Sequence, residues 1–107
     1  MVSPHFAARI RLRRPSEGGR KTGADLRLYR PDDIPFQVED EPVFFGAHFS
    51  PDAGWLEPGE TKELDIQIRN VASAFMAHVA RGTKFLLVEG PKAVADGEVT
   101  VVYRIDD

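Results

Sequence analysis

The chain has 107 residues, no cysteine, and 17 acidic against 14 basic side chains, which gives a formal net charge of −3. This length suits one domain with a single hydrophobic core, so residues 1–107 are treated as one domain. Without cysteine there are no disulfides or thiolate metal sites, and no apolar run reaches the ~20 residues of a membrane helix. The first residues also lack the apolar core of a signal peptide, so we expect a cytoplasmic protein without membrane contact.

Basic and acidic side chains are unevenly distributed along the chain. Residues 1–30 carry eight basic and two acidic side chains, a net of +6, whereas residues 31–107 carry a net of −9. A basic end on an acidic chain can bind RNA or an acidic protein. Alternatively, opposite charges from distant segments meet on neighbouring strands and neutralise each other. The sequence leaves both interpretations open.

The first regular segment, from Phe6 to Arg13, alternates strictly between two faces, which predicts a half-buried strand. Its apolar face carries Phe6, Ala8, Ile10 and Leu12. Its outer face carries Ala7 and a ladder of three arginines, Arg9, Arg11 and Arg13. Pro15 then ends the strand, because proline lacks the N–H that pairs in a sheet. The glycines at positions 18 and 19 predict a tight reversal.

Further strand-like segments follow, separated by turns marked with glycine and proline. They cover residues 25–30, 34–38, 43–49, 62–69, 83–89 and 98–105. Glu39–Pro42 is expected to be a loop or a sheet edge, and Gly90–Gly97 the return before the last strand. Pro58-Gly59 suits a type II turn. Only Asn70–Arg81, closed by Gly82, has helical composition. The chain is therefore predicted to be an all-β sandwich or barrel with at most one short helix.

The segment at 62–69 supplies a possible partner for the arginine ladder. Its apolar residues alternate with an outer face of Glu63, Asp65, Gln67 and Arg69. Opposite charges on directly facing residues stabilise an antiparallel pair. The acidic face would therefore neutralise the ladder if the two strands were neighbours.

No arrangement of side chains indicates an enzyme or a metal site. The histidines, at positions 5, 48 and 78, lack metal-ligand spacing, and Asp32 and Asp33 are adjacent turn formers whose side chains point apart. No serine lies in a nucleophile motif, and the G-x-x-x-x-G-K-S/T phosphate loop is absent. We expect no catalytic residues, no cofactor, no metal and no bound nucleotide.

Four segments in a fixed order give the chain a resemblance to a known family. Glu17-Gly18-Gly19-Arg20-Lys21-Thr22 follows the first strand, and Tyr29-Arg30-Pro31 comes soon after it. Pro58-Gly59 precedes an alternating strand, and Glu89–Val99 has the length of a final glycine-marked hairpin. In this order the segments resemble the C-terminal domain, domain 3, of translation elongation factor Tu. The resemblance covers nearly the whole chain and implies a stand-alone six-stranded antiparallel Greek-key β-barrel.

The resemblance also implies which residues contact a partner. In the full elongation factor this barrel contacts the T stem of aminoacyl-tRNA and the neighbouring GTPase domain. The matching positions, joined by two arginines of the first strand, form a candidate binding surface. Its residues are Arg9, Arg11, Arg20, Lys21, Thr22, Tyr29, Arg30 and Lys92.

This surface is compatible with two functions. In the first, a protein-interaction module docks an acidic partner; in the second, an RNA-binding module retains part of the tRNA T-stem contact. Glu39–Glu41 and Asp96 add negative charge, which disfavours phosphate binding. A protein partner is therefore the first hypothesis. Trp55, beside a turn, is either a rim residue of the barrel or a partner anchor, and the oligomeric state is left open.

Overall fold

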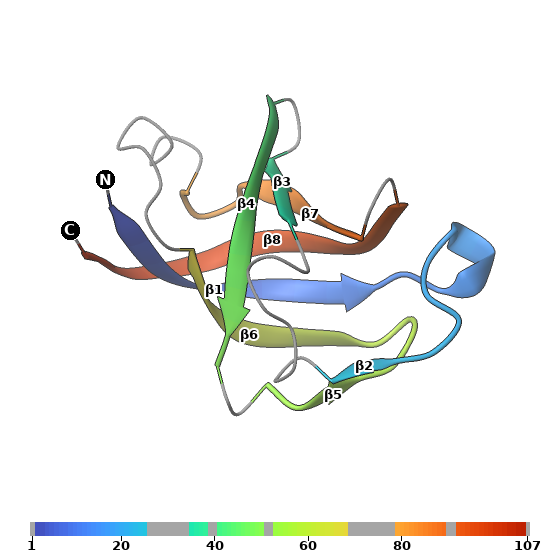
Figure 1. Ribbon diagram of the computed structural model, residues 1–107. Helices are drawn as coiled ribbons and strands as arrows, with labels where there is room; N and C mark the ends of the chain where they lie inside the picture. Colours follow the sequence, from blue (N-terminus) through green and yellow to red (C-terminus); the bar gives the residue numbers. More distant parts are fainter. Residues whose placement is uncertain are drawn as a thin grey trace.

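The computed structural model describes residues 2–25, 35–38, 41–50, 53–68, 79–89 and 92–106. Within these residues every paired strand is antiparallel, and the helical content is a single 3-10 turn, η1 (Pro15–Glu17) (Figure 1). The predicted all-β antiparallel class is therefore confirmed.

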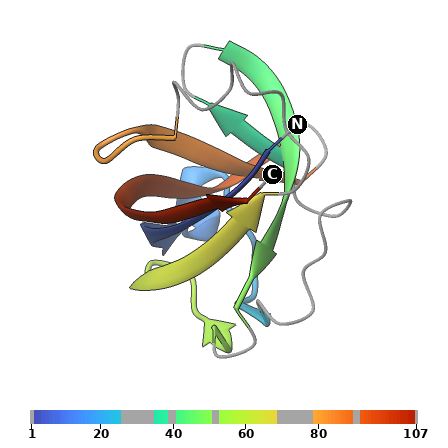
Figure 2. The same cartoon turned by 90° about the vertical axis from the view of Figure 1, so that its left-hand side faces the viewer.

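Six of the described strands pair in a closed ring (Figures 1 and 2). In the order of their pairing they are β1 (Ser3–Leu12), β6 (Thr61–Ile68), β4 (Glu41–Phe49), β3 (Pro35–Val38), β7 (Lys84–Glu89) and β8 (Lys92–Asp106). The ring closes because β8 pairs with β1, so neither strand is left as a free edge along this pairing. A second, two-stranded sheet joins β2 (Ala24–Asp25) to β5 (Trp55–Leu56).

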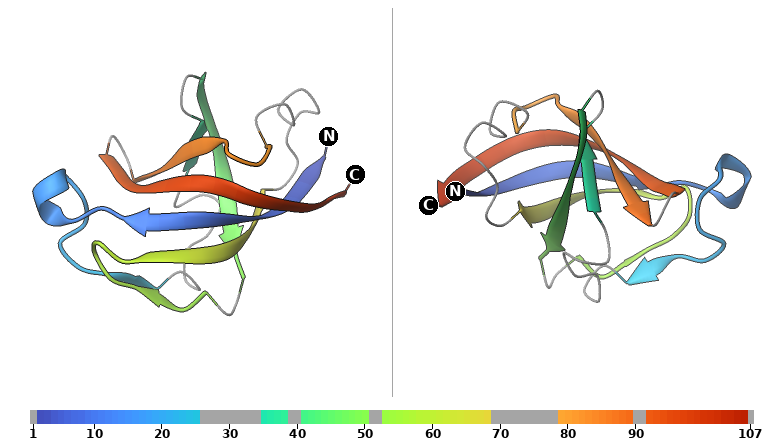
Figure 3. Two further views of the ribbon diagram at one scale, coloured as in Figure 1. Left: turned by 180° about the vertical axis from the view of Figure 1, so that it is seen from behind. Right: turned by 45° about the horizontal axis from the view of Figure 1, so that its top comes forward.

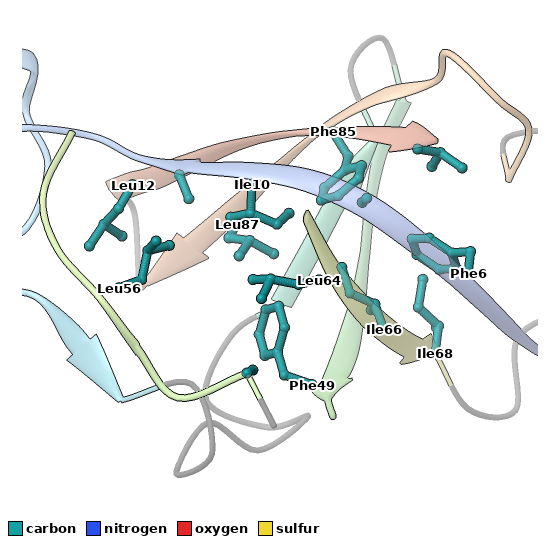
Figure 4. Packing of buried hydrophobic residues seen from close by; sticks show 14 of the residues in the cluster. Phe6, Ile10, Leu12, Phe49, Leu56, Leu64, Ile66, Ile68, Phe85 and Leu87 are labelled. Carbon is teal, nitrogen blue, oxygen red and sulfur yellow. The ribbon is translucent and has the colours of Figure 1, made fainter. Parts of the chain in front are cut away.

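The inward-facing side chains of strands with alternating apolar and polar residues fill the interior of the ring. The predicted inward residues of β1 are all buried, and so are Leu64, Ile66 and Ile68 of β6 (Figure 4). The rings of Phe6 and Phe85 meet edge to face, with centroids 6.4 Å apart and planes at 82°, an arrangement that aromatic pairs prefer. The core thus rests on the period-two pattern that the sequence shows most clearly.

The predicted return at Gly90–Gly97 was wrong for most of its length. β8 begins at Lys92 and continues through Gly97, paired with β7 on one side and β1 on the other. The physical reason lies at Gly97, where an added Cβ would lie 2.2 Å from the ring of Phe85. Glycine is present there to make room for a core aromatic ring, not to form a turn.

Two other predictions are met only in part by the described residues. The predicted helix Asn70–Arg81 lies outside them except at 79–81, which form a bend and a turn. β4 already begins at Glu41, so Pro42 lies inside a strand. A register shift separates the β3 residues Gln37 and Val38 opposite this part of β4, and such irregular positions tolerate proline.

Candidate binding surface

Six of the eight candidate residues lie in the described part of the chain. Arg9 and Arg11 are on β1, and Lys92 begins β8. Arg20, Lys21 and Thr22 lie in the connection between η1 and β2. Figure 3 shows η1 and the β2–β5 pair at the end of the barrel where β1 finishes. Tyr29 and Arg30 lie outside the described residues.

The glycine turn folds back against the end of β1. Gly18 has φ +84°, and the Gly19 N–H donates to the Arg14 carbonyl at 2.9 Å. An added Cβ at Gly19 would lie 2.2 Å from the carbonyl oxygen of Arg13. The reversal predicted from the two glycines is confirmed, because one supplies the positive φ and the other allows the close approach.

Glu17 holds this turn to the arginine ladder. Its carboxylate accepts two bonds from the Arg11 guanidinium, at 2.7 and 3.1 Å, and one from the Arg14 backbone N–H at 2.9 Å. The Arg11 bond is the main cause that lowers the pKa of Glu17 from 4.5 to about 2. The same bond raises the pKa of Arg11. Both groups therefore stay charged at neutral pH and face each other.

The other two arginines of the ladder form ion pairs with acidic residues of β8. Arg9 lies between Glu63 of β6 and Glu98 of β8 in the sheet register, and its Nη2 is 3.7 Å from Glu98 Oε2. Arg13 donates two bonds to Asp96, at 2.7 and 2.9 Å. These bonds are the main cause that raises the pKa of Arg13. The ion pairs therefore join the ladder to β8, while on the β6 side the register places Glu63 opposite Arg9, as expected for neighbouring strands.

Arg20 reaches a strand that is far from it in sequence. Its Nη1 donates to Glu89 Oε2 at 2.7 Å, at the end of β7. Lys92 is directly opposite Glu89 across the β7–β8 pair. Two candidate cations thus flank one carboxylate, while Lys21, Thr22 and Lys92 themselves are exposed. This exposed group is the part of the candidate surface that the structure leaves most open to a partner.

Sequence reasoning missed the carboxylates that pair with the candidate arginines. Asp96 and Glu98 line an open depression of about 320 Å³ together with Arg9, Thr61, Lys84 and Gly97. Asp96 was assigned to a return, and only its true place in β8, opposite Arg11, shows that it faces the ladder. The alternation of acids at positions 96 and 98 was the available signal, and it was masked by Gly97.

Trp55 lies beside this end of the barrel and is 49% exposed. Its indole N–H donates to Glu57, and its carbonyl accepts a bond of 2.7 Å from Lys62 Nζ. An added Cβ at Gly23 would lie 2.7 Å from the indole ring, so the ring covers the backbone of that glycine. The side chain is held in place from one side and open to solvent from another.

Comparison with known proteins finds neither a family model nor a curated sequence that matches this chain. In the part of the chain that the structure describes, no group of three or more His, Asp or Glu side chains could hold a metal ion. Over the same residues, no helix is long and apolar enough to cross a membrane. The described part of the candidate surface offers ion pairs and hydrogen bonds for contact with a partner.

Proposed function

We propose that this chain is a non-catalytic protein-binding module, a Greek-key barrel related to the C-terminal barrel of elongation factor Tu. Its contact surface is the barrel end that carries Lys21, Thr22 and Lys92, beside the ion pair of Arg20 and Glu89. The order of the sequence motifs supports the relationship. The charge pattern of the surface supports a protein as the partner.

The observation that carries the proposal is the pairing of the arginines. Arg9, Arg11, Arg13 and Arg20 each have a carboxylate within 2.7 to 3.7 Å. Positive and negative groups therefore alternate across the surface that carries these four arginines. A protein surface, which also carries both signs, can match such a pattern, and complementary charges favour the correct partner over others.

RNA is the second candidate, and the same pairing weakens it. A phosphate backbone presents only negative charge, and its affinity for a protein comes from cations that neutralise phosphates. Here a phosphate would have to displace a two-point arginine–carboxylate contact, as at Arg13 and Asp96, and such contacts are among the stronger ion pairs. The tRNA contact of the family is thus expected to be weak or lost.

A tRNA titration separates the two candidates. We expect the native protein to show little binding to labelled tRNA by fluorescence anisotropy, even at about 50 mM salt. A variant with Asp96→Asn and Glu98→Gln frees Arg9 and Arg13 and should bind more tightly, with affinity that falls steeply towards about 200 mM salt. Tight binding by the native protein would instead favour the RNA-binding function.

Affinity capture then tests the surface itself. The protein is used as bait against a lysate of its native cell, and captured proteins are quantified by mass spectrometry. The variant Lys21→Glu with Lys92→Glu should lose the enriched partner. The control Arg81→Glu with Lys84→Glu changes the net charge equally at exposed positions before and at the start of β7 and should keep the partner. A partner that both variants keep would contradict the proposed surface.

A further inference from the structure

Trp55 lies next to the contact surface proposed above. It belongs to β5, which pairs with β2 at the same end of the barrel (Figure 3). A Cβ added at Gly23 would lie 2.7 Å from the indole atoms Nε1 and Cε2, and Gly23 directly follows Lys21 and Thr22 in the chain. The indole ring therefore lies beside the segment that carries two of the proposed contact residues.

The fold holds Trp55 in place without covering it. The indole N–H donates to Glu57, and the backbone carbonyl of Trp55 accepts a bond of 2.7 Å from Lys62 Nζ. Trp55 is nevertheless 49% exposed. An aromatic side chain that is already held loses little conformational freedom when a partner covers it, and tryptophan is enriched among the residues that contribute most to binding.

The charged side chains next to Trp55 are mainly acidic. Glu57 accepts the indole N–H, and Asp25 is directly opposite Trp55 across the β2–β5 pair. Glu60 Oε1 accepts a bond of 3.0 Å from the Glu57 backbone N–H. Lys62 is the cation bonded to the Trp55 carbonyl, so three carboxylates and one ammonium leave this group with a net charge of −2. An exposed indole beside net negative charge attracts cations.

We propose that Trp55 and Glu57 form a binding site for an arginine side chain of the protein partner. This inference rests on the proposed function, because it names what the partner brings to the same end of the barrel. A guanidinium group is flat, so it stacks on an indole ring while the N–H groups at its rim donate to a carboxylate. Lys21 and Lys92 nearby attract groups of the opposite sign. The partner surface is therefore expected to present an arginine beside acidic side chains.

The first test uses the single tryptophan of the chain, whose fluorescence reports on this site alone. The native protein is titrated with glycyl-arginyl-glycine, blocked at both ends, up to about 20 mM, since one side chain alone binds weakly. The emission should change along a saturable curve. The same peptide with neutral citrulline in place of arginine should bind at least about threefold more weakly. Equal binding of the two peptides, or no saturable change with arginine, would overturn the proposal.

Matched variants then test the carboxylate. Glu57→Gln keeps the size of the side chain and removes its charge, so it should weaken binding of the arginine peptide by about threefold or more. The control Glu98→Gln removes a carboxylate from β8, a strand that does not pair with β5, and should leave binding unchanged. Circular dichroism checks that each variant folds. Equal losses in both variants would show that net charge alone attracts the peptide, which contradicts a site at Trp55.

The arginine site and the proposed function can fail separately. The titration uses neither the partner nor Lys21 and Lys92, so it can fail while affinity capture succeeds. In the capture experiment Trp55→Ala should reduce the enriched partner, whereas Trp55→Phe should keep part of it, because phenylalanine also binds cations, though more weakly. A partner that Trp55→Ala keeps in full would contradict the arginine site and leave the contact surface standing. Saturable binding of the arginine peptide without any captured partner would contradict the proposed function instead.

Discussion

The two halves of β8 form surfaces of opposite kinds on one strand. In the first half Glu98 pairs with Arg9 of β1 and Asp96 with Arg13, just after β1, and β7 pairs along the other side. In the second half Val101, Tyr103 and Ile105 stay exposed, and β1 is the neighbour among the described strands. In the first half the chain pairs its own charges, so a ligand of uniform charge gains little there. The second half leaves apolar side chains exposed to water.

The same pairing explains why the arginines of β1 do not stand alone on the described surface. The +6 of residues 1–30 and the −9 of the remainder are separate in the sequence, but β1 lies between β6 and β8, which carry acidic residues. Arg9, for example, sits between Glu63 and Glu98. Charge asymmetry along a chain is therefore a poor guide to charge asymmetry on a closed sheet.

Among the substitutions considered in the first half of β8, a change at Gly97 should lower the stability of the fold most. We expect Gly97→Ala to destabilise the fold by about 3 kcal/mol, because a Cβ there would overlap the Phe85 ring and overpacking of a core is costly. The free energy of unfolding from urea titration measures this effect. Gly18→Ala is the matched control: its Cβ would have no atom within 4 Å, so only the strained positive φ opposes it, at about 1 kcal/mol. Equal losses would contradict the packing explanation.

Removing the Arg13–Asp96 contact is a milder test of how much the ion pairs in the first half of β8 stabilise the fold. Asp96→Ala should lower the free energy of unfolding by about 1 kcal/mol, since the contact has two short bonds but is partly exposed. Glu98→Ala removes the looser 3.7 Å contact with Arg9 and should cost less. Both losses should shrink in about 1 M salt. An Asp96 effect that salt does not change would show that packing, not charge, is responsible.

The strands with strict alternation could be predicted from the sequence, because burial on one face enforces a period of two. Residues 6–13 and 62–69 were placed within three residues of β1 and β6, with their inward residues identified correctly. The sequence did not predict that these two strands pair. It predicted only that their charges would be neutralised if they did. Strand neighbours depend on the whole ring, and no local pattern in residues 6–13 specifies which acidic strand lies beside them.

Asp96 and Gly97 show where sequence reasoning fails on this chain. Both residue types are depleted in strands, so the segment was assigned to a return. The structure keeps both in β8 for tertiary reasons: Phe85 occupies the space beside Gly97, and Arg13 binds Asp96. Packing and pairing thus override local preference here. Ala7, which the alternation places on the wet face, is also fully buried, between Asp65 of β6 and Val101 of β8 in the sheet register.

The smallest expected effect is that of substituting Glu17. The substitution tests whether ion pairs hold the turn at residues 17–19, as they do along the first half of β8. The pKa of Glu17 is about 2 in the folded protein against an ordinary 4.5. A lowered pKa means that the carboxylate stabilises the fold fully above pH 4.5, and that this contribution is lost as the pH falls from about 4.5 towards about 2. Glu17→Gln should therefore unfold at lower urea than the native protein at neutral pH. The gap should narrow steadily below about pH 4.5. A gap that is the same at about pH 6 and about pH 3 would show that Arg11 and Arg14 do not hold the charged form of Glu17.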